Sequence, residues 1–368
     1  MKIPLVDLRA QYHRLKTGID DAIQNVIEES SFIRGKYVTA FENEFAKKYG
    51  IRHCISVANG TDAIYITLKM LGIGEGDEVI TTALSWISTS ETITQTGATP
   101  VFTDIEPEYF CIDANKIEEK ITPRTKAVIP VHLYGQPADI HKIKTLCKKH
   151  KLFLVEDCAQ AHFAEYENLK VGTFGMAATF SFYPGKNLGA YGDAGAIITN
   201  DDVLAEKCRM FANHGSLQKH KHLMEGINSR MDGLQGAVLN IKLPYIDEWN
   251  NRRLQHALYY NKLLAGIEQV ITPQIRKDCK HIFHIYCLRV IDRNALMESL
   301  RNNGIETAIH YPAALPNMPA YSYMNCRPSD FPVASEYQDQ IVSLPMFPEL
   351  TNGQIEHVVR EIKNFYLS

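Results

Sequence analysis

The stretch Thr179-Phe-Ser-Phe-Tyr-Pro-Gly-Lys-Asn-Leu-Gly-Ala-Tyr-Gly-Asp-Ala-Gly195 leads from an apolar approach into a turn rich in glycine. Lys186 follows Gly185 and precedes Gly189, which is not the setting of a helix-surface charge. Glycines let the backbone approach a bound group closely, and a desolvated lysine amine is a nucleophile that forms Schiff bases with carbonyls. A lone lysine in a turn is more often an ordinary surface residue, so its neighbours decide its role.

Short apolar segments alternate with helical ones on both sides of this turn. We expect strands at 54–57, 78–81, 100–103, 126–133, 152–155, 177–182 and 196–199, with helices at 88–95 and 139–150 among the connections. Residues 152–155 are almost continuously apolar, as in a strand that is buried on both faces. The alternation predicts an α/β fold whose sheet is mainly parallel and covered by helices.

The two ends of the chain do not show this alternation of strands and helices. Residues 1–50 read as a polar arm followed by helices at 19–30 and 37–49, and such an arm can pack on a partner subunit. After about Pro244 we expect helices at 249–264, 293–303 and 352–366 with a strand at 284–290. We therefore predict a large domain over 1–245, including the arm, and a smaller C-terminal α+β domain over 246–368.

The composition excludes several classes of protein. The 368 residues have 45% hydrophobic content, 22% charged content and a net charge of −3, which favours neither a nucleic-acid nor a membrane partner. No signal peptide begins the sequence, and eight scattered cysteines without a Cys-x-x-Cys pair suit reduced thiols in the cytoplasm. His214, His220 and His222 lack metal-ligand spacing, so we expect no metal.

Three polar signals fall where the predicted strands end, which is where open α/β sheets bind ligands. Gly60 and Thr61 begin a helix whose free N–H groups suit a phosphate, although an ordinary helix cap explains them equally. Asp157 ends an apolar strand, where it can charge a pyridine nitrogen or simply form a salt bridge. Ser181 and Lys186 follow another strand. Together, the three signals predict a pyridoxal 5'-phosphate site.

Four motifs extend this prediction over nearly the whole chain. They are Val155-Glu-Asp-Cys-Ala-Gln-Ala-His162, Ser181-Phe-Tyr-Pro-Gly-Lys-Asn-Leu-Gly189 with Gly192-Asp-Ala-Gly195, Asn228-Ser-Arg-Met-Asp-Gly-Leu-Gln235 and His310-Tyr-Pro312. In this order they closely resemble the DegT/DnrJ/StrS family of pyridoxal-phosphate-dependent sugar aminotransferases. The resemblance implies fold type I of these enzymes and a homodimer whose active sites are shared between subunits.

The resemblance also assigns residues. Lys186 matches the Schiff-base lysine, Asp157 the partner of the ring nitrogen, and Gln160 the residue that hydrogen-bonds the ring hydroxyl. The cofactor-binding set that it implies is Gly60, Thr61, Trp86, Asp157, Gln160, Ser181, Lys186 and Asn228, with Asn228 coming from the other subunit. Trp86 would stack on the cofactor, and a buried core tryptophan is the competing interpretation. The implied contacts to a nucleotide-sugar are Tyr183, Arg230, His310 and Tyr311, each of which can also be structural.

Two places depart from the family pattern. Phe163 stands where a glycine is common, and Ile33-Arg-Gly-Lys36 replaces a turn of the Leu-Gly-Pro type. We hypothesise that Arg34 and Lys36 flank the entrance and bind the substrate diphosphate. One subgroup of the family has histidine in place of the lysine and performs dehydration, which Lys186 argues against.

The expected reaction moves an amino group from L-glutamate to a nucleotide-linked keto-sugar. The resemblance favours C-3 of a keto-hexose, with C-4 amination, a dehydratase or lyase of the same fold, or a cofactor-binding regulator as alternatives. The product would be an amino-sugar nucleotide for a surface glycan such as the O-antigen of lipopolysaccharide. The nucleotide, the sugar's stereochemistry and the final glycan do not follow from the sequence.

Overall fold

A seven-stranded sheet forms the centre of the computed structural model, which describes residues 1–367. Its strands, in spatial order, are β1 (His53–Val57), β9 (Gly195–Thr199), β8 (Ala177–Ser181), β5 (Phe153–Asp157), β4 (Thr125–Ile129), β2 (Glu78–Thr82) and β3 (Thr99–Thr103). Neighbours from β8 to β3 pair in parallel, and only β9 runs against its neighbours. The predicted mainly parallel α/β sheet is confirmed.

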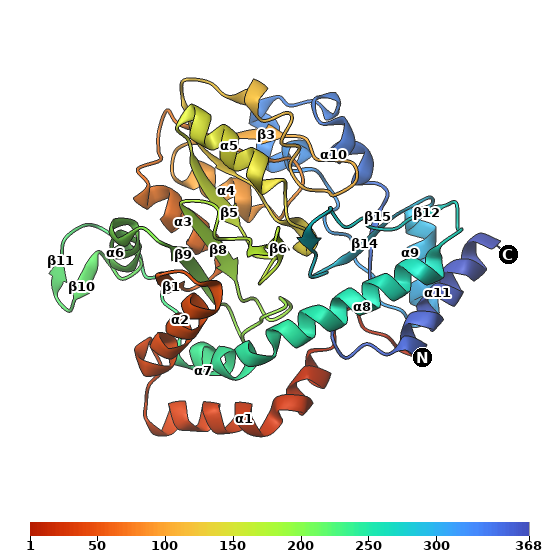
Figure 1. The fold of residues 1–368 in the computed structure, drawn as a ribbon, viewed down its shortest axis with the longest axis horizontal. Helices are drawn as coiled ribbons and strands as arrows, with labels where there is room; N and C mark the ends of the chain where they lie inside the picture. Colours follow the sequence, from red (N-terminus) through yellow and green to blue (C-terminus); the bar gives the residue numbers. More distant parts are fainter. Residues whose placement is uncertain (368) are drawn as a thin grey trace.

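Helices cover both faces of this sheet (Figure 1). They include α2 (Gly35–Tyr49), α3 (Gly60–Met70), α4 (Ser88–Gln95), α5 (Ile140–His150) and α6 (Asp202–Phe211). Helix α7 (Gly233–Lys242) packs on α2, and α1 (Leu8–Glu28) packs on α7. Successive strand residues point to opposite faces: Ala127 and Ile129 join a core with α3 and α4, whereas Val128 joins a core with α5. The burial of both faces explains why these strands read as continuous apolar runs.

A second, antiparallel sheet lies in the C-terminal part of the chain. It contains β12 (Val270–Ile271), β14 (Tyr286–Val290) and β15 (Ile341–Leu344), and packs with α8 (Ile246–Leu264), α9 (Arg293–Asn302) and α11 (Asn352–Leu367). Ile3 bridges to Ile305, so both termini lie at this end of the molecule, as Figure 1 shows. The division near residue 245 remains our proposal.

Short elements complete the fold. They are β6 (Glu165–Tyr166), β7 (Leu169–Lys170), β13 (Cys279–Lys280), β10 (Ser216–Gln218), β11 (Lys221–His222) and α10 (Pro332–Tyr337). The β13 strand pairs with β6 and thereby connects the C-terminal part to the segment after β5. None of the helices within residues 1–367 is both long and apolar enough to cross a membrane.

The structure corrects two sequence-based boundaries and adds one helix. The strand expected over 126–133 ends at Ile129, because Pro130 has no N–H for the ladder and the chain then enters a short 3-10 turn. The first helix begins at Leu8, well before the expected residue 19, with Asp7 accepting a hydrogen bond from the Ala10 N–H. Helix α7 was not predicted, since its apolar residues pack against α1 and α2 rather than forming one clear stripe.

Candidate active site

A cavity of about 580 Å³ opens where the ends of β2, β5 and β8 meet the start of α3. It brings together most of the residues that the sequence singled out. The predicted residues on its wall are Gly60, Thr61, Trp86, Asp157, Gln160, Ser181, Tyr183, Lys186, His310 and Tyr311. Residues far apart in the chain therefore form one site, as the carboxyl ends of parallel strands allow.

The start of α3 forms an anion cradle beside Ser181. Asn59 caps the helix by accepting a hydrogen bond from the Asp62 N–H at 2.8 Å, which leaves the Thr61 hydroxyl free of capping. Thr61 Oγ1 instead lies 2.7 Å from Ser88 Oγ. A Cβ on Gly60 would come within 2.7 Å of Ser181 Cβ, so only glycine lets the helix start this close to β8. Free helix N–H groups with hydroxyls nearby suit a phosphate.

Asp157 is the last residue of β5 and is buried. Its two carboxylate oxygens accept hydrogen bonds from Thr89 Oγ1 at 2.9 Å and from the Ala159 N–H at 3.1 Å. Burial raises the pKa of Asp157, and these hydrogen bonds together with the nearby Lys186 oppose the rise. The carboxylate is thus held in one orientation at the cavity wall and lacks a directly bonded cation.

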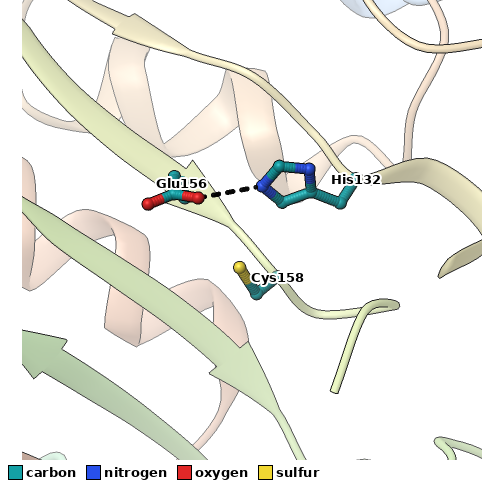
Figure 2. A group of neighbouring side chains, drawn as sticks. All are labelled: His132, Glu156 and Cys158. Atoms are coloured by element: carbon teal, nitrogen blue, oxygen red, sulfur yellow. Dashed lines mark hydrogen bonds and ion pairs between the residues drawn. The ribbon is translucent and has the colours of Figure 1, made fainter. Parts of the chain in front are cut away.

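A buried histidine and glutamate brace the strand end that carries Asp157 (Figure 2). His132 Nδ1 accepts the Ala138 N–H, so its Nε2 carries the proton and donates to Glu156 at 3.1 Å. The Glu156 carboxylate also accepts three backbone N–H groups, from residues 172, 174 and 175. Cys158 lies beside this pair, but neither imidazole nitrogen retains a lone pair for a metal. The cluster is a structural brace.

Lys186 lies in the turn after β8, with its backbone N–H donating to the Tyr183 carbonyl at 2.8 Å. Desolvation lowers the pKa of its amine to about 8, and the charge of Asp157 partly offsets this effect. A second buried lysine, Lys242, donates to the Gly189 carbonyl at 2.7 Å and so fixes the other end of the turn. An amine with a depressed pKa is available near neutral pH as a nucleophile and as a base.

Gln160 and two aromatic side chains form a further part of the cavity wall. Gln160 Oε1 accepts the Tyr134 N–H at 2.6 Å, and its Nε2 donates to the Tyr311 hydroxyl at 2.8 Å. The Trp86 ring lies 5.7 Å from that of Tyr311 and is 58% exposed. Trp86 is therefore a cavity residue rather than a core tryptophan, and its face is free for a planar ligand.

Arg34, Asn228 and Arg230 do not line this cavity. The Arg34 N–H donates to the Met231 carbonyl at 3.2 Å, which places the turn before α2 beside the Arg230 segment. Burial lowers the pKa of Arg34, and the positive charges of Arg209 and Arg230 lower it further, while Glu42 opposes them. Arg230 Nε is buried and has no hydrogen-bond partner within residues 1–367.

The chain resembles proteins of known class along its whole length. Residues 14–363 match the DegT/DnrJ/EryC1/StrS aminotransferase family. The chain belongs to this family. A pleiotropic regulatory protein of Geobacillus stearothermophilus is 45% identical over 100% of this chain and 99% of its own. The dTDP-3-amino-3,4,6-trideoxy-alpha-D-glucose transaminase of Streptomyces venezuelae is 39% identical over 99% of this chain and 96% of its own.

Solved structures agree with this assignment. The S. venezuelae DesV structure superposes with a TM-score of 0.97 at 39% identity, covering 100% of this chain and 99% of that one. The predicted fold type I and the predicted aminotransferase are confirmed: this protein is a sugar aminotransferase. NtdA of Bacillus subtilis, 32% identical with a TM-score of 0.88 over 96% of this chain and 82% of its own, was solved with bound cofactor PMP.

The cofactor of this aminotransferase is pyridoxal 5'-phosphate, and the cavity fits it. The α3 N-terminus with Thr61 and Ser181 supplies donors for a phosphate. Asp157 is a buried carboxylate without a bonded cation, which suits a protonated ring nitrogen, and Lys186 is an amine with a depressed pKa. Trp86 offers an exposed ring at the same wall.

Several polar wall residues were not predicted, among them Ser85, Ser88, Thr89, Asp193 and His284. Ser85 lies between β2 and α4, and Ser88 and Thr89 begin α4, so their position shortly after a strand was a usable signal. Asp193 lies in the glycine-rich stretch at 179–195, but no motif marked it as a site residue. His284 precedes β14 in the C-terminal part, and no local pattern places that segment beside Lys186.

Proposed function

We propose that this enzyme transfers the amino group of L-glutamate to a nucleotide-linked keto-sugar, with C-3 of a keto-hexose as the favoured position. The observation that carries the proposal is the meeting of Lys186, Asp157 and the α3 N-terminus in one cavity of a family member. The product is an amino-sugar nucleotide, which we place in the cytoplasm as a precursor of surface glycans such as O-antigen.

Each polar residue of the cavity has a separate role in the proposed reaction. When bound, pyridoxal 5'-phosphate supplies a carbonyl for the amino group and a ring that takes up electron density. The Lys186 amine takes a proton from the α-carbon of the donor and, in the second half of the reaction, delivers one to the sugar carbon. Asp157, held by Thr89 and Ala159, pairs with the protonated ring nitrogen. Thr61 and Ser181 hold the phosphate, and Gln160 the ring hydroxyl.

We further propose a homodimer in which Arg34, Asn228 and Arg230 of one copy complete the cavity of the other. Two features support this. These residues do not line their own cavity, and the buried Arg230 Nε has no partner within the described residues. Arg34 lies near Arg209 and Arg230, and the neighbouring carboxylate of Glu42 is paired with Arg209 at 2.9 Å. Arg34 and Arg230 therefore attract an anion such as the substrate diphosphate. Tyr183, His310 and Tyr311 contact the sugar from the cavity's own chain.

The preference for C-3 rests on resemblance. The motifs at 226–232 and 310–312 are similar to those of 3-aminotransferases, and the Streptomyces relative is named for a 3-amino sugar. Amination at C-4 is the competing outcome. The nucleotide base has no determinant that we can identify among the described residues.

Spectral titration tests the proposal. Glutamate should convert the purified enzyme to its amino form, and one nucleotide keto-sugar from a panel should return it to the starting form. The product is then examined by NMR to locate the new amine. An amine at C-4 would contradict the C-3 preference, and release of ammonia or loss of a sugar oxygen would contradict transamination.

A further inference from the structure

His284 lies on the cavity wall with Lys186 and His310, and the proposed reaction gives it no role. It precedes β14, so it comes from the C-terminal part of the chain, whereas Lys186 comes from the turn after β8. His284 Nδ1 lies 3.1 Å from Oδ1 of Asn187, the residue that follows Lys186. The turn that carries Lys186 and the C-terminal part of the chain are therefore in contact at the His284 imidazole.

The orientation of the Asn187 amide is fixed by its other partners. Its Nδ2 lies 3.2 Å from the Ile282 carbonyl and 2.8 Å from Asn250 Oδ1. A carbonyl oxygen only accepts hydrogen bonds, so the NH₂ group must face Ile282 and the Oδ1 must face His284. Asn250 is oriented in the same way, because its own Nδ2 donates to the His162 carbonyl at 2.9 Å.

This arrangement sets the tautomer of His284. Since Asn187 Oδ1 accepts, His284 Nδ1 carries the proton, and Nε2 presents a lone pair. Burial lowers the pKa of His284 well below its usual value, and the neighbouring Lys186, Arg253, His310 and His162 act in the same direction. The imidazole thus stays neutral at physiological pH. Within residues 1–367, the bond to Asn187 is the one hydrogen bond of its ring.

We propose that His284 is a hydrogen-bond acceptor in the reaction cavity, held in its working tautomer by Asn187 and Asn250, and that it binds a donor group there. A lone pair at Nε2 repels carboxylates and phosphates and accepts from an ammonium or a hydroxyl. Two groups in the cavity have this chemistry: the amine of Lys186 when it is free, and a hydroxyl of the sugar. The assignment of these two rests on the proposed function.

Asn187 and Asn250 are positioning residues in this account. Both are buried, and together they join the lysine turn, helix α8 and the segment before β14. A displacement of α8 or of that segment therefore moves His284 and the backbone next to Lys186 together. The Nε2 of His284 and the amine of Lys186 therefore keep their positions relative to each other, as a hydrogen bond between them requires.

Two substitutions of His284 separate the acceptor role from the structural one. In His284→Asn, the side-chain NH₂ takes the place of Nδ1 and keeps the bond to Asn187, but nothing replaces Nε2. In His284→Gln, the side-chain oxygen reaches the Nε2 position and the bond to Asn187 is lost. If Nε2 is an acceptor, His284→Asn should slow turnover by about 10- to 100-fold, and His284→Gln should recover most of the rate. The reverse order would overturn the proposal.

The two half-reactions identify the donor group. Conversion by glutamate and reconversion by the keto-sugar are each followed by absorbance in single-turnover experiments. Slowing of both halves in His284→Asn identifies the Lys186 amine, and slowing of the second half alone identifies a sugar hydroxyl. Unchanged rates in both halves would overturn the role of His284. Failure of the proposed function itself would be seen separately, as a wild-type enzyme that glutamate does not convert.

A readout that does not depend on activity is the tautomer itself. In the cofactor-free wild type labelled with [15N]histidine, the His284 signals, identified by their loss in His284→Gln, should show Nδ1 protonated and should not titrate. In Asn187→Asp, the new carboxylate should raise the pKa of His284 despite the opposing charges of Lys186, Arg253, His310 and His162. The signals should then titrate. A wild-type ring protonated at Nε2 would contradict the assignment.

Discussion

The cofactor side of the cavity differs from the arginine corner in how its polar side chains are held. The arginine corner consists of Arg34, Asn228 and Arg230. On the cofactor side, polar groups sit at the ends of strands and helices and are held by hydrogen bonds within the chain, as at Asp157 and Gln160. In the arginine corner, side chains come from turns, and the buried Arg230 Nε has no partner within residues 1–367. The side chains of the first region line the cavity of their own chain, whereas those of the second do not.

The largest effect should come from removing the Lys186 amine on the cofactor side of the cavity. Lys186→Ala should lower transamination by about 10⁴-fold, because the Lys186 amine is the proton-transfer group of the proposed reaction. The visible absorbance of the lysine-bound cofactor should also disappear, while the circular dichroism of the fold stays unchanged. A variant that retained activity would remove Lys186 from the mechanism.

Asp157→Asn should cost less, about 10²- to 10³-fold in turnover, since the cofactor still binds but the ring nitrogen loses its charged partner. Cofactor content measured after dialysis is the control. A wild-type rate at full occupancy would show that Asp157 does not act on the ring.

The pH dependence of cofactor capture tests the coupling between these two residues. Only the neutral amine is nucleophilic, so capture of pyridoxal 5'-phosphate by the cofactor-free enzyme should speed up through about pH 8 and then level off. The charge of Asp157 raises the pKa of Lys186. In Asp157→Asn, the midpoint of the stopped-flow profile should therefore move to lower pH, and an upward move would contradict the coupling.

Substitutions in the arginine corner should instead weaken substrate binding. Arg230→Ala and Arg34→Ala should each raise the KM for the nucleotide-sugar by about 10- to 100-fold, the worth of one charged hydrogen bond, with conversion by glutamate unchanged. Lys36 is exposed and paired with Glu29 at 2.7 Å, so Lys36→Ala should raise this KM less than Arg34→Ala does. Wild-type substrate affinity in Arg34→Ala/Lys36→Ala would refute the hypothesis that these two residues hold the diphosphate.

The smallest expected effect is the difference in stability between two substitutions of Phe163. Phe163, which replaces the glycine common in the family, has a φ of 62° and stacks on Tyr49 with ring centroids 4.4 Å apart. Phe163→Ala should lose about 3 kcal/mol of stability through the lost packing. Phe163→Gly should be as stable as the alanine variant or more so, because only glycine adopts this φ freely. Thermal unfolding decides the order, and a clearly less stable glycine variant would contradict it.

The sequence predicted the cofactor side of the cavity better than the residues that are brought in from distant parts of the chain. Gly60, Asp157 and Lys186 lie at or shortly after the ends of apolar strands, so the rule that parallel strands gather their carboxyl ends places them together. The boundary at Ile129 follows from Pro130 and was within reach of the sequence. Asn187 and His284 meet through tertiary packing across nearly a hundred residues, for which no local pattern exists. The role that we propose for Arg230 depends on a second copy of the chain, which the sequence suggests only by resemblance.

Mixing of two impaired variants tests most directly whether a second copy completes the site. Lys186→Ala and Arg230→Ala enzymes, each impaired alone, are mixed under conditions that allow subunit exchange and assayed well below the KM. Our account predicts recovery to roughly a quarter of the wild-type activity, because half of randomly exchanged dimers carry one intact site. If hybrid dimers are detected through distinct tags and no activity returns, Arg230 acts within its own chain or not at all, and the account is contradicted.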